Sequence, residues 1–124
     1  MKRYIALFLA LAMSLCGVNV FAKTEYTASD WAKTELEDAE NAGIIPTEFD
    51  GRDFTQDINR MDFAKVLVKT YEAISQKSVQ EGQISPFEDC TDADVLKAYT
   101  LGFINGVDEN HFSPASFLTR EQAA

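Results

Sequence analysis

The strongest constraint on this chain is that its two halves repeat a short pattern of residues. Residues 42–45 match residues 101–104, and residues 58–64 match residues 118–124, at offsets of 59 and 60 positions. Self-similarity at a fixed period is typical of proteins built from copies of one small unit. The sequence therefore predicts two copies of one helix-loop-helix unit, with loops of unequal length, in place of a single irregular domain.

Each predicted unit has two helices, so the expected fold is all-α. The first helix starts at Ser29 or Asp30 and ends at Gly43, because a small polar residue is a good N-cap and glycine a good C-terminal stop. The second helix starts after Asn59, where Asp62 three residues on resembles a capping box. Its apolar positions recur at steps of three and four residues: Phe63, Val66, Leu67, Thr70, Tyr71 and Ile74.

The same signals appear again in the second half. Residues 75–85 are mostly polar and predict a surface connection. A third helix starts at Thr91 or Asp92 and ends at Gly102. Thr119 followed by Gln122 predicts a capping box that opens a fourth helix. Because the matching second helix continues to about Ile74, we expect at least ~10 further residues in the fourth, and a third repeat or an effector domain beyond it.

Residues 1–22 have the three parts of a secretory signal. Lys2 and Arg3 precede an apolar run over residues 4–15, and Ala22 offers a small residue for cleavage. The run is shorter than the about 20 apolar residues that span a bilayer. Cleavage after Ala22 would leave 102 of the 124 residues. A lipid anchor at Cys16 is the alternative, but Leu15 stands where a small residue is needed, so we predict a secreted protein with no membrane span after signal removal.

Charge and cysteine content restrict the partners. The whole chain has a formal net charge of −9, and removal of the two basic signal residues leaves 9 basic and 20 acidic residues, a charge of −11. Nucleic acids and anionic membranes both favour clustered Lys and Arg, so neither is an expected partner. Cys90 is the one cysteine after the signal, and no disulfide framework is expected.

The ordered set of motifs resembles the S-layer homology family. The first copy is carried by residues 30–32, 43–45, 50–51 and 59–62, which read Asp-Trp-Ala, Gly-Ile-Ile, Asp-Gly and Asn-Arg-Met-Asp. The second copy is carried by residues 86–89, 102–106, 112–114 and 119–122, which read Pro-Phe-Glu-Asp, Gly-Phe-Ile-Asn-Gly, Phe-Ser-Pro and Thr-Arg-Glu-Gln. We therefore expect a signal over residues 1–22, one repeat with its linker over 23–85, and a second, incomplete repeat over 86–124.

Three departures from the family pattern stand out. Asn59 replaces the family's threonine, no proline follows Phe54 in the first copy, and the second copy has no tryptophan. The first copy is therefore expected to serve the scaffold more than the ligand site.

The resemblance implies a function at the bacterial cell wall. Members of the family anchor exported proteins by binding secondary cell-wall polysaccharide, often with pyruvylated sugars, in grooves between repeats. In the family an arginine after the helix cap contacts the anionic group, and this implies Arg60 and Arg120 as ligand-binding residues here. Each would add a forked contact to a carboxylate beside the positive end of a helix dipole. The alternative is that each arginine pairs with an acidic neighbour and holds two repeats together.

Trp31 is a third candidate, because an aromatic face suits the C–H surface of a sugar ring; the alternative is that Trp31 belongs to the core. His111 has no partner at ligand spacing and is expected in a loop. The acidic residues Asp89, Asp92, Asp94, Asp108 and Glu109 do not match an EF-hand. We expect them to be solvated caps and turns, and we predict no metal, no cofactor and no catalytic constellation.

The predicted function is noncovalent attachment of an exported protein to a cell-wall polymer, at the cell surface. Two alternatives remain open. The chain could be the wall-binding part of a larger surface enzyme, or a helical module that binds protein.

Overall fold

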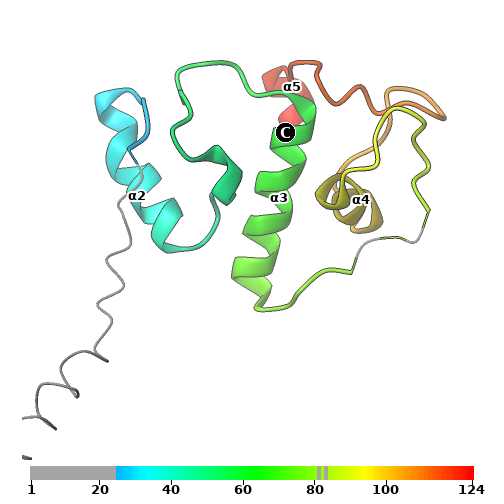
Figure 1. Ribbon diagram of the computed structural model, residues 1–124, viewed down its shortest axis with the longest axis horizontal. Helices are drawn as coiled ribbons and strands as arrows, with labels where there is room; N and C mark the ends of the chain where they lie inside the picture. The colour runs from blue at the N-terminus through cyan, green and yellow to red at the C-terminus, as the bar shows by residue number, and fades with distance from the viewer. Residues whose placement is uncertain (1–24, 81, 83) are drawn as a thin grey trace, which may run out of the picture.

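The computed structural model describes residues 25–80, 82 and 84–124 of the chain. Its elements, where η marks a short 3-10 helix, are η1 (Asp30–Ala32), α2 (Lys33–Asn41), η2 (Thr47–Phe49), α3 (Arg60–Ser75), α4 (Ala93–Thr100) and α5 (Arg120–Ala123). The described residues contain no strand or sheet, only two isolated backbone bridges, Thr27 with Asp53 and Asn59 with Phe117. The predicted all-α fold is confirmed. In Figure 1, α3 stands between α2 and α4, and α5 lies near the first turn of α3.

Three of the four predicted helix starts have the expected side-chain cap. The Asn59 side chain accepts the Asp62 backbone N–H at 2.8 Å. Asp92 accepts two backbone N–H groups at the start of α4. Thr119 and Gln122 form a complete capping box at α5. Because a cap of this kind stabilises a helix by about 1 kcal/mol, these residues set where the three helices begin.

The first helix starts differently from the prediction. Its first turn is the 3-10 helix η1, and Ser29 makes no side-chain cap hydrogen bond. Asp30 does not cap either, because its carboxylate accepts the Lys33 ammonium at 2.7 Å. The expected side-chain cap at Ser29 or Asp30 was therefore wrong, and the local ion pair took its place.

Helices α2 and α4 end in the same way. Gly43 and Gly102 have φ angles of 72° and 75°, the left-handed region that favours glycine. The next N–H reaches back five residues in each case, from Ile44 to the Ala39 carbonyl at 3.0 Å and from Phe103 to the Ala98 carbonyl at 2.9 Å. The two matched segments of sequence thus adopt one local geometry, although the boundaries at 23–85 and 86–124 stay a prediction.

The core lies between α3 and α4. Small residues on the facing helices allow close packing, and two phenylalanines from the loops complete it. Burial of one such aromatic side chain stabilises the fold by roughly 1.5–3 kcal/mol. The buried cluster consists of Ala64, Val68, Phe87, Cys90, Val95, Ala98 and Phe112.

Helix α2 is peripheral to this core. It contains no buried residue, and its only close neighbour among the other elements is η1. Trp31, at the start of this region, is 80% exposed, so the alternative that placed it in the core is excluded. Its side chain instead faces solvent.

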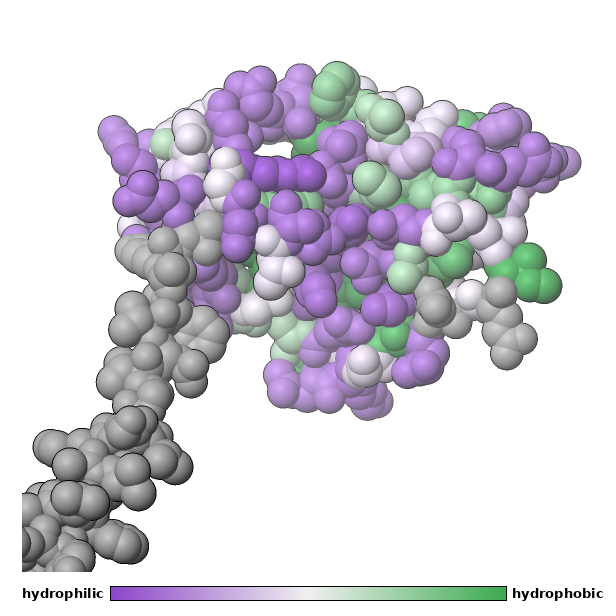
Figure 2. Space-filling view, in the orientation of Figure 1, coloured by the Kyte–Doolittle hydropathy of each residue, from purple (hydrophilic) through white to green (hydrophobic). Residues whose placement is uncertain are grey.

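The surface agrees with the charge of the sequence. Hydrophilic residues cover most of the face seen in Figure 2, with smaller hydrophobic areas between them. The predicted signal at residues 1–22 lies outside the described residues. Within the described part, none of the helices has the length and apolar character needed to cross a bilayer.

Candidate functional site

Arg60 is the first residue of α3, and the backbone around it is tied to the second half of the chain. The Arg60 N–H donates to the Ser116 carbonyl at 2.8 Å, and the Met61 N–H donates to the Pro114 carbonyl at 3.1 Å. Since Asn59 accepts the Asp62 N–H, the first three amides of α3 are occupied. These amides are therefore not free to bind an anion at the helix start, because carbonyls from residues 114 and 116 and the Asn59 side chain already accept them.

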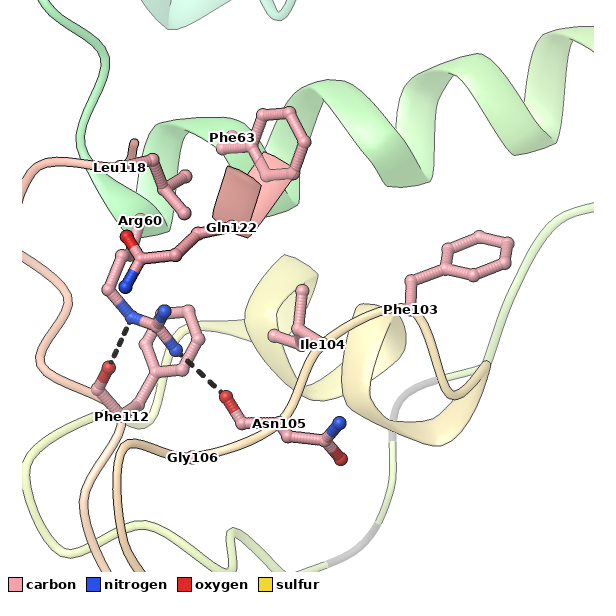
Figure 3. Close-up of a pocket in the computed structure, with 9 residues that line it drawn as sticks. All are labelled: Arg60, Phe63, Phe103, Ile104, Asn105, Gly106, Phe112, Leu118 and Gln122. Atoms are coloured by element: carbon pink, nitrogen blue, oxygen red, sulfur yellow. Dashed lines mark hydrogen bonds between the residues drawn. The ribbon is translucent and has the colours of Figure 1, made fainter. Parts of the chain in front are cut away.

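The Arg60 side chain makes a forked contact with a loop of the second half. Its Nε donates to the Phe112 carbonyl at 2.8 Å, and its Nη2 donates to the Asn105 carbonyl at 2.8 Å (Figure 3). The guanidinium carbon also lies 4.7 Å from the centre of the Phe112 ring. Arg60 therefore joins the two halves through backbone carbonyls, where the interface alternative had expected an acidic neighbour.

The same guanidinium forms one wall of a cavity of about 240 Å³. Apolar side chains and two amide side chains form the other walls, as Figure 3 shows. The lining residues are Arg60, Phe63, Phe103, Ile104, Asn105, Gly106, Phe112, Leu118 and Gln122. They come from α3, from the loop after α4 and from the region of α5, so the cavity lies between the two predicted copies.

The loop over residues 105–113 has a defined shape. A Cβ at Gly106 would lie 2.4 Å from the Asp108 carbonyl oxygen and 2.8 Å from that of His111, so only glycine fits there. The Val107 N–H donates to the His111 carbonyl at 2.8 Å and closes the turn. The Asp108 carboxylate accepts the backbone N–H groups of Asn110 and His111.

Charged groups reinforce this loop. The Asp108 carboxylate lies 2.9 Å from His111 Nδ1, and this contact raises the pKa of His111. Hydrogen bonds from the Asn110 backbone and the His111 side chain lower the pKa of Asp108. The carboxylate of Asp89 accepts the backbone N–H groups of Phe112 and Ser113, each at 2.8 Å, and the Phe112 bond is the largest cause that lowers the pKa of Asp89. His111 and these carboxylates act here as turn and loop contacts, as the sequence predicted.

The other two candidate residues lie away from this cavity. Arg120 is exposed on α5, and its side chain has no hydrogen-bond or ion-pair partner among the described residues. Trp31 is exposed in η1, and neither residue lines the cavity that contains Arg60. The three predicted residues are therefore not brought together into one site.

One charged cluster around the buried Asp62 had no clear sequence signal. Asp62 is 4% exposed, pairs with Arg52 and accepts the Asn59 side-chain amide at 2.9 Å. Arg52 also stacks on the Phe49 ring at 4.3 Å. This cluster fixes the loop before α3. The sequence marked Asp62 only as the third residue of a capping box with Asn59, whereas its carboxylate binds the Asn59 side-chain amide and Arg52.

A metal site has no basis in the described residues. No group of three or more His, Cys, Asp or Glu side chains within them could hold an ion. Cys90 is buried in the core, and burial raises the pKa of its thiol.

Comparison with known proteins finds a family match in the second half of the chain. The family model described as the S-layer homology domain matches residues 91–124. The chain is 30% identical over 109 residues to an amylopullulanase from Thermoanaerobacterium thermosulfurigenes, an alignment that covers 82% of this chain and 6% of that protein. The chain thus spans a small part of the length of this relative. No solved structure matches the chain.

The family match, the relative and the all-α structure point the same way. The matched segment contains α4, the loop that contacts Arg60, and the capping box of α5. S-layer homology domains are binding modules that associate proteins with the bacterial cell wall. Over residues 91–124 this chain is similar to the S-layer homology domain family.

Proposed function

We propose that the chain anchors an exported protein to the cell wall by binding an anionic cell-wall polysaccharide in the Arg60 cavity. The observation that carries the proposal is the fixed guanidinium at the cavity wall. Its Nε and Nη2 donate to carbonyls, whereas Nη1 has no acceptor among the described residues and is available to a ligand carboxylate.

The cavity also suits a sugar in size and chemistry. Its volume of about 240 Å³ is below the roughly 300–1,000 Å³ of common ligand pockets, so one sugar unit fits better than an oligosaccharide. Phe103, Ile104 and Leu118 offer apolar surface for sugar C–H groups. The side-chain amide of Asn105 offers a donor and an acceptor for hydroxyl groups, and the Gln122 amide offers its N–H₂ donors, since its oxygen accepts the Thr119 N–H.

A single contact of this kind gives weak binding. One charge-assisted hydrogen bond contributes about 1.5–3 kcal/mol, which corresponds to millimolar rather than nanomolar affinity once the costs of association are included. A polymer presents the same anionic group many times, so further sites add avidity. Arg120 and Trp31 are proposed as such additional contacts, because both side chains are exposed.

The net charge opposes this partner only at long range. A charge of −11 after signal removal repels an anionic polymer and slows its approach. At physiological salt, however, the Debye length is about 8 Å, so a guanidinium in direct contact with its ligand is little affected.

A second candidate is a module of a larger surface enzyme. The amylopullulanase relative favours it, because the chain covers only 6% of that protein. In that case the segment would hold the enzyme at the wall. A helical module that binds protein is the other alternative, and sedimentation with purified cell walls distinguishes it from binding to polysaccharide.

Sedimentation with purified cell walls tests the proposal. We expect the protein to co-sediment with intact walls and to stay in solution when the polysaccharide has been extracted. Arg60→Ala and Arg120→Ala should each weaken co-sedimentation several-fold, whereas Lys77→Ala, which removes an equal charge from an exposed position, should not.

Equal binding to extracted walls would favour a protein partner and reject the proposal. Arg60→Ala has its own complication, since the side chain also joins the two halves. Melting temperatures of every variant therefore accompany the binding data, and only loss of binding by a folded variant counts in favour of the site.

A further inference from the structure

The orientation of Arg60 depends on two carbonyls in a loop that is largely exposed. Six of the eight residues from Asn105 to Phe112 are exposed, among them all five at the tip, over 107–111. The buried Phe112 side chain anchors one end of the loop in the core, and the direction of the Phe112 carbonyl depends in addition on the hydrogen bonds of its peptide group. The structure offers one group with the right geometry, the carboxylate of Asp89.

Asp89 and Arg60 hold opposite sides of one peptide group. Asp89 Oδ2 accepts the Ser113 N–H at 2.8 Å, and Arg60 Nε donates to the Phe112 carbonyl at 2.8 Å. The Phe112 C=O and the Ser113 N–H belong to the same peptide, which is planar and rigid. Fixing the direction of the N–H therefore fixes the direction of the carbonyl.

The arrangement is also favourable electrostatically. A carboxylate at the N–H end and a guanidinium at the C=O end both polarise the peptide in the same sense, which strengthens each bond. Asp89 Oδ1 accepts the Phe112 N–H as well, so the carboxylate holds two successive amides. Ser113 has a φ of 56°, an uncommon value for a residue other than glycine, and the two bonds from Asp89 maintain it.

We propose that Asp89 is a positioning residue for Arg60: through the peptide between Phe112 and Ser113 it orients the guanidinium so that Nη1 faces the ligand. The effect on ligand binding rests on the proposed function, whereas the orientation of Arg60 by Asp89 can be tested without a ligand. Asp89 does not line the cavity, so it acts through Arg60 and the loop.

The direct test observes the Arg60 Nε–H by NMR in ¹⁵N-labelled protein without ligand. In the unsubstituted protein this proton is hydrogen-bonded and should exchange slowly with solvent. Asp89→Ala should speed its exchange about tenfold or more and move its resonance toward that of a free arginine. Asp92→Ala is the matched control, because the Asp92 carboxylate also accepts two backbone N–H groups but caps α4 and does not touch the loop.

Each outcome decides the proposal. An unchanged Arg60 resonance in folded Asp89→Ala, or an equal change in Asp92→Ala, would overturn the positioning role. If Asp89→Ala does not fold, Asp89→Asn is measured, since its amide keeps one acceptor oxygen; it should give an intermediate exchange rate, and an unchanged rate would again overturn the role.

Wall binding separates this role from the proposed function. Folded Asp89→Ala should lose binding together with Arg60→Ala, whereas Asp92→Ala should keep it. Full wall binding by Arg60→Ala would reject the proposed function alone, because the NMR result would still decide whether Asp89 orients Arg60.

Discussion

At the scale of single residues, Arg60 has a structural role that its position in the motif does not reveal. It donates two charge-assisted hydrogen bonds to carbonyls of the second half. We predict that Arg60→Ala lowers the free energy of unfolding by about 2 kcal/mol, because both bonds and the stacking on Phe112 are lost. Urea denaturation measures this change. A loss below about 0.5 kcal/mol would mean that the forked contact does not join the halves.

A second residue-scale prediction concerns pH. The pKa of His111 is raised by Asp108, so the stability from this pair is complete below the ordinary value of about 6.5 and is lost as the pH rises through the folded pKa. The pKa of Asp108 is lowered, so its contribution is lost as the pH falls below about 4. His111→Asn should therefore lower the melting temperature by a few degrees at most near pH 5.5 and not at pH 8.5.

The nearby carboxylates of Asp89 and Glu88 act in the same direction on His111. An Asp108→Asn background supplies the control, because Asn keeps an acceptor for the backbone but removes the partner charge. In that background the difference between pH 5.5 and pH 8.5 should shrink. A pH dependence that survives in full would assign it to groups other than this pair.

The candidate residues show what a single sequence can and cannot reveal at this scale. Arg60 and Arg120 could be found because each follows a helix cap in a repeated motif. The role of Asp89 could not, because its backbone partners lie 23 and 24 residues away and make no local pattern. The exposure of Trp31 was equally hidden, since it depends on how little of α2 is covered.

At the scale of elements, two glycines in the same conformation end two helices that contribute differently to the core. Gly43 and Gly102 have φ angles of 72° and 75°, and a Cβ at either would meet no atom within 4 Å. Alanine at either position should therefore destabilise the local helix end by about 1 kcal/mol, from backbone strain alone. Because α4 forms the core and α2 buries nothing, we predict that only Gly102→Ala lowers global stability.

Urea denaturation combined with hydrogen exchange separates the two effects. Gly43→Ala should speed exchange in α2 while leaving the global midpoint unchanged, since local opening has its own free energy. Gly102→Ala should lower the midpoint. If both substitutions lowered it equally, α2 would unfold together with α3 and α4.

The elements were more predictable than their packing. Caps and glycine stops are local signals, so the starts of α3, α4 and α5 and the ends of α2 and α4 agree with the sequence. The 3-10 turn at η1 was missed, because the cap residues Ser29 and Asp30 looked the same in sequence whether or not they cap; Ser29 makes no cap hydrogen bond and Asp30 pairs with Lys33. The long-range acceptors for the first amides of α3 had no local signal either.

At the scale of the whole molecule, the repeated pattern and the family match point to a wall-binding module whose two halves meet at Arg60. The core between α3 and α4 holds Phe112, and Phe112 in turn holds the guanidinium from both its carbonyl and its ring. We therefore propose that stability and ligand binding are coupled at this position. We also propose, as the central claim, that the module anchors its protein by binding an anionic polymer.

The most direct measurement of that claim is calorimetric titration of the protein with extracted cell-wall polysaccharide, before and after chemical removal of its anionic groups. The proposal predicts heat of binding with the native polymer, a several-fold loss of affinity after the anionic groups are removed, and a similar loss in folded Arg60→Ala and Arg120→Ala. Absence of binding to the native polymer, or equal affinity for the polymer without its anionic groups, would contradict it.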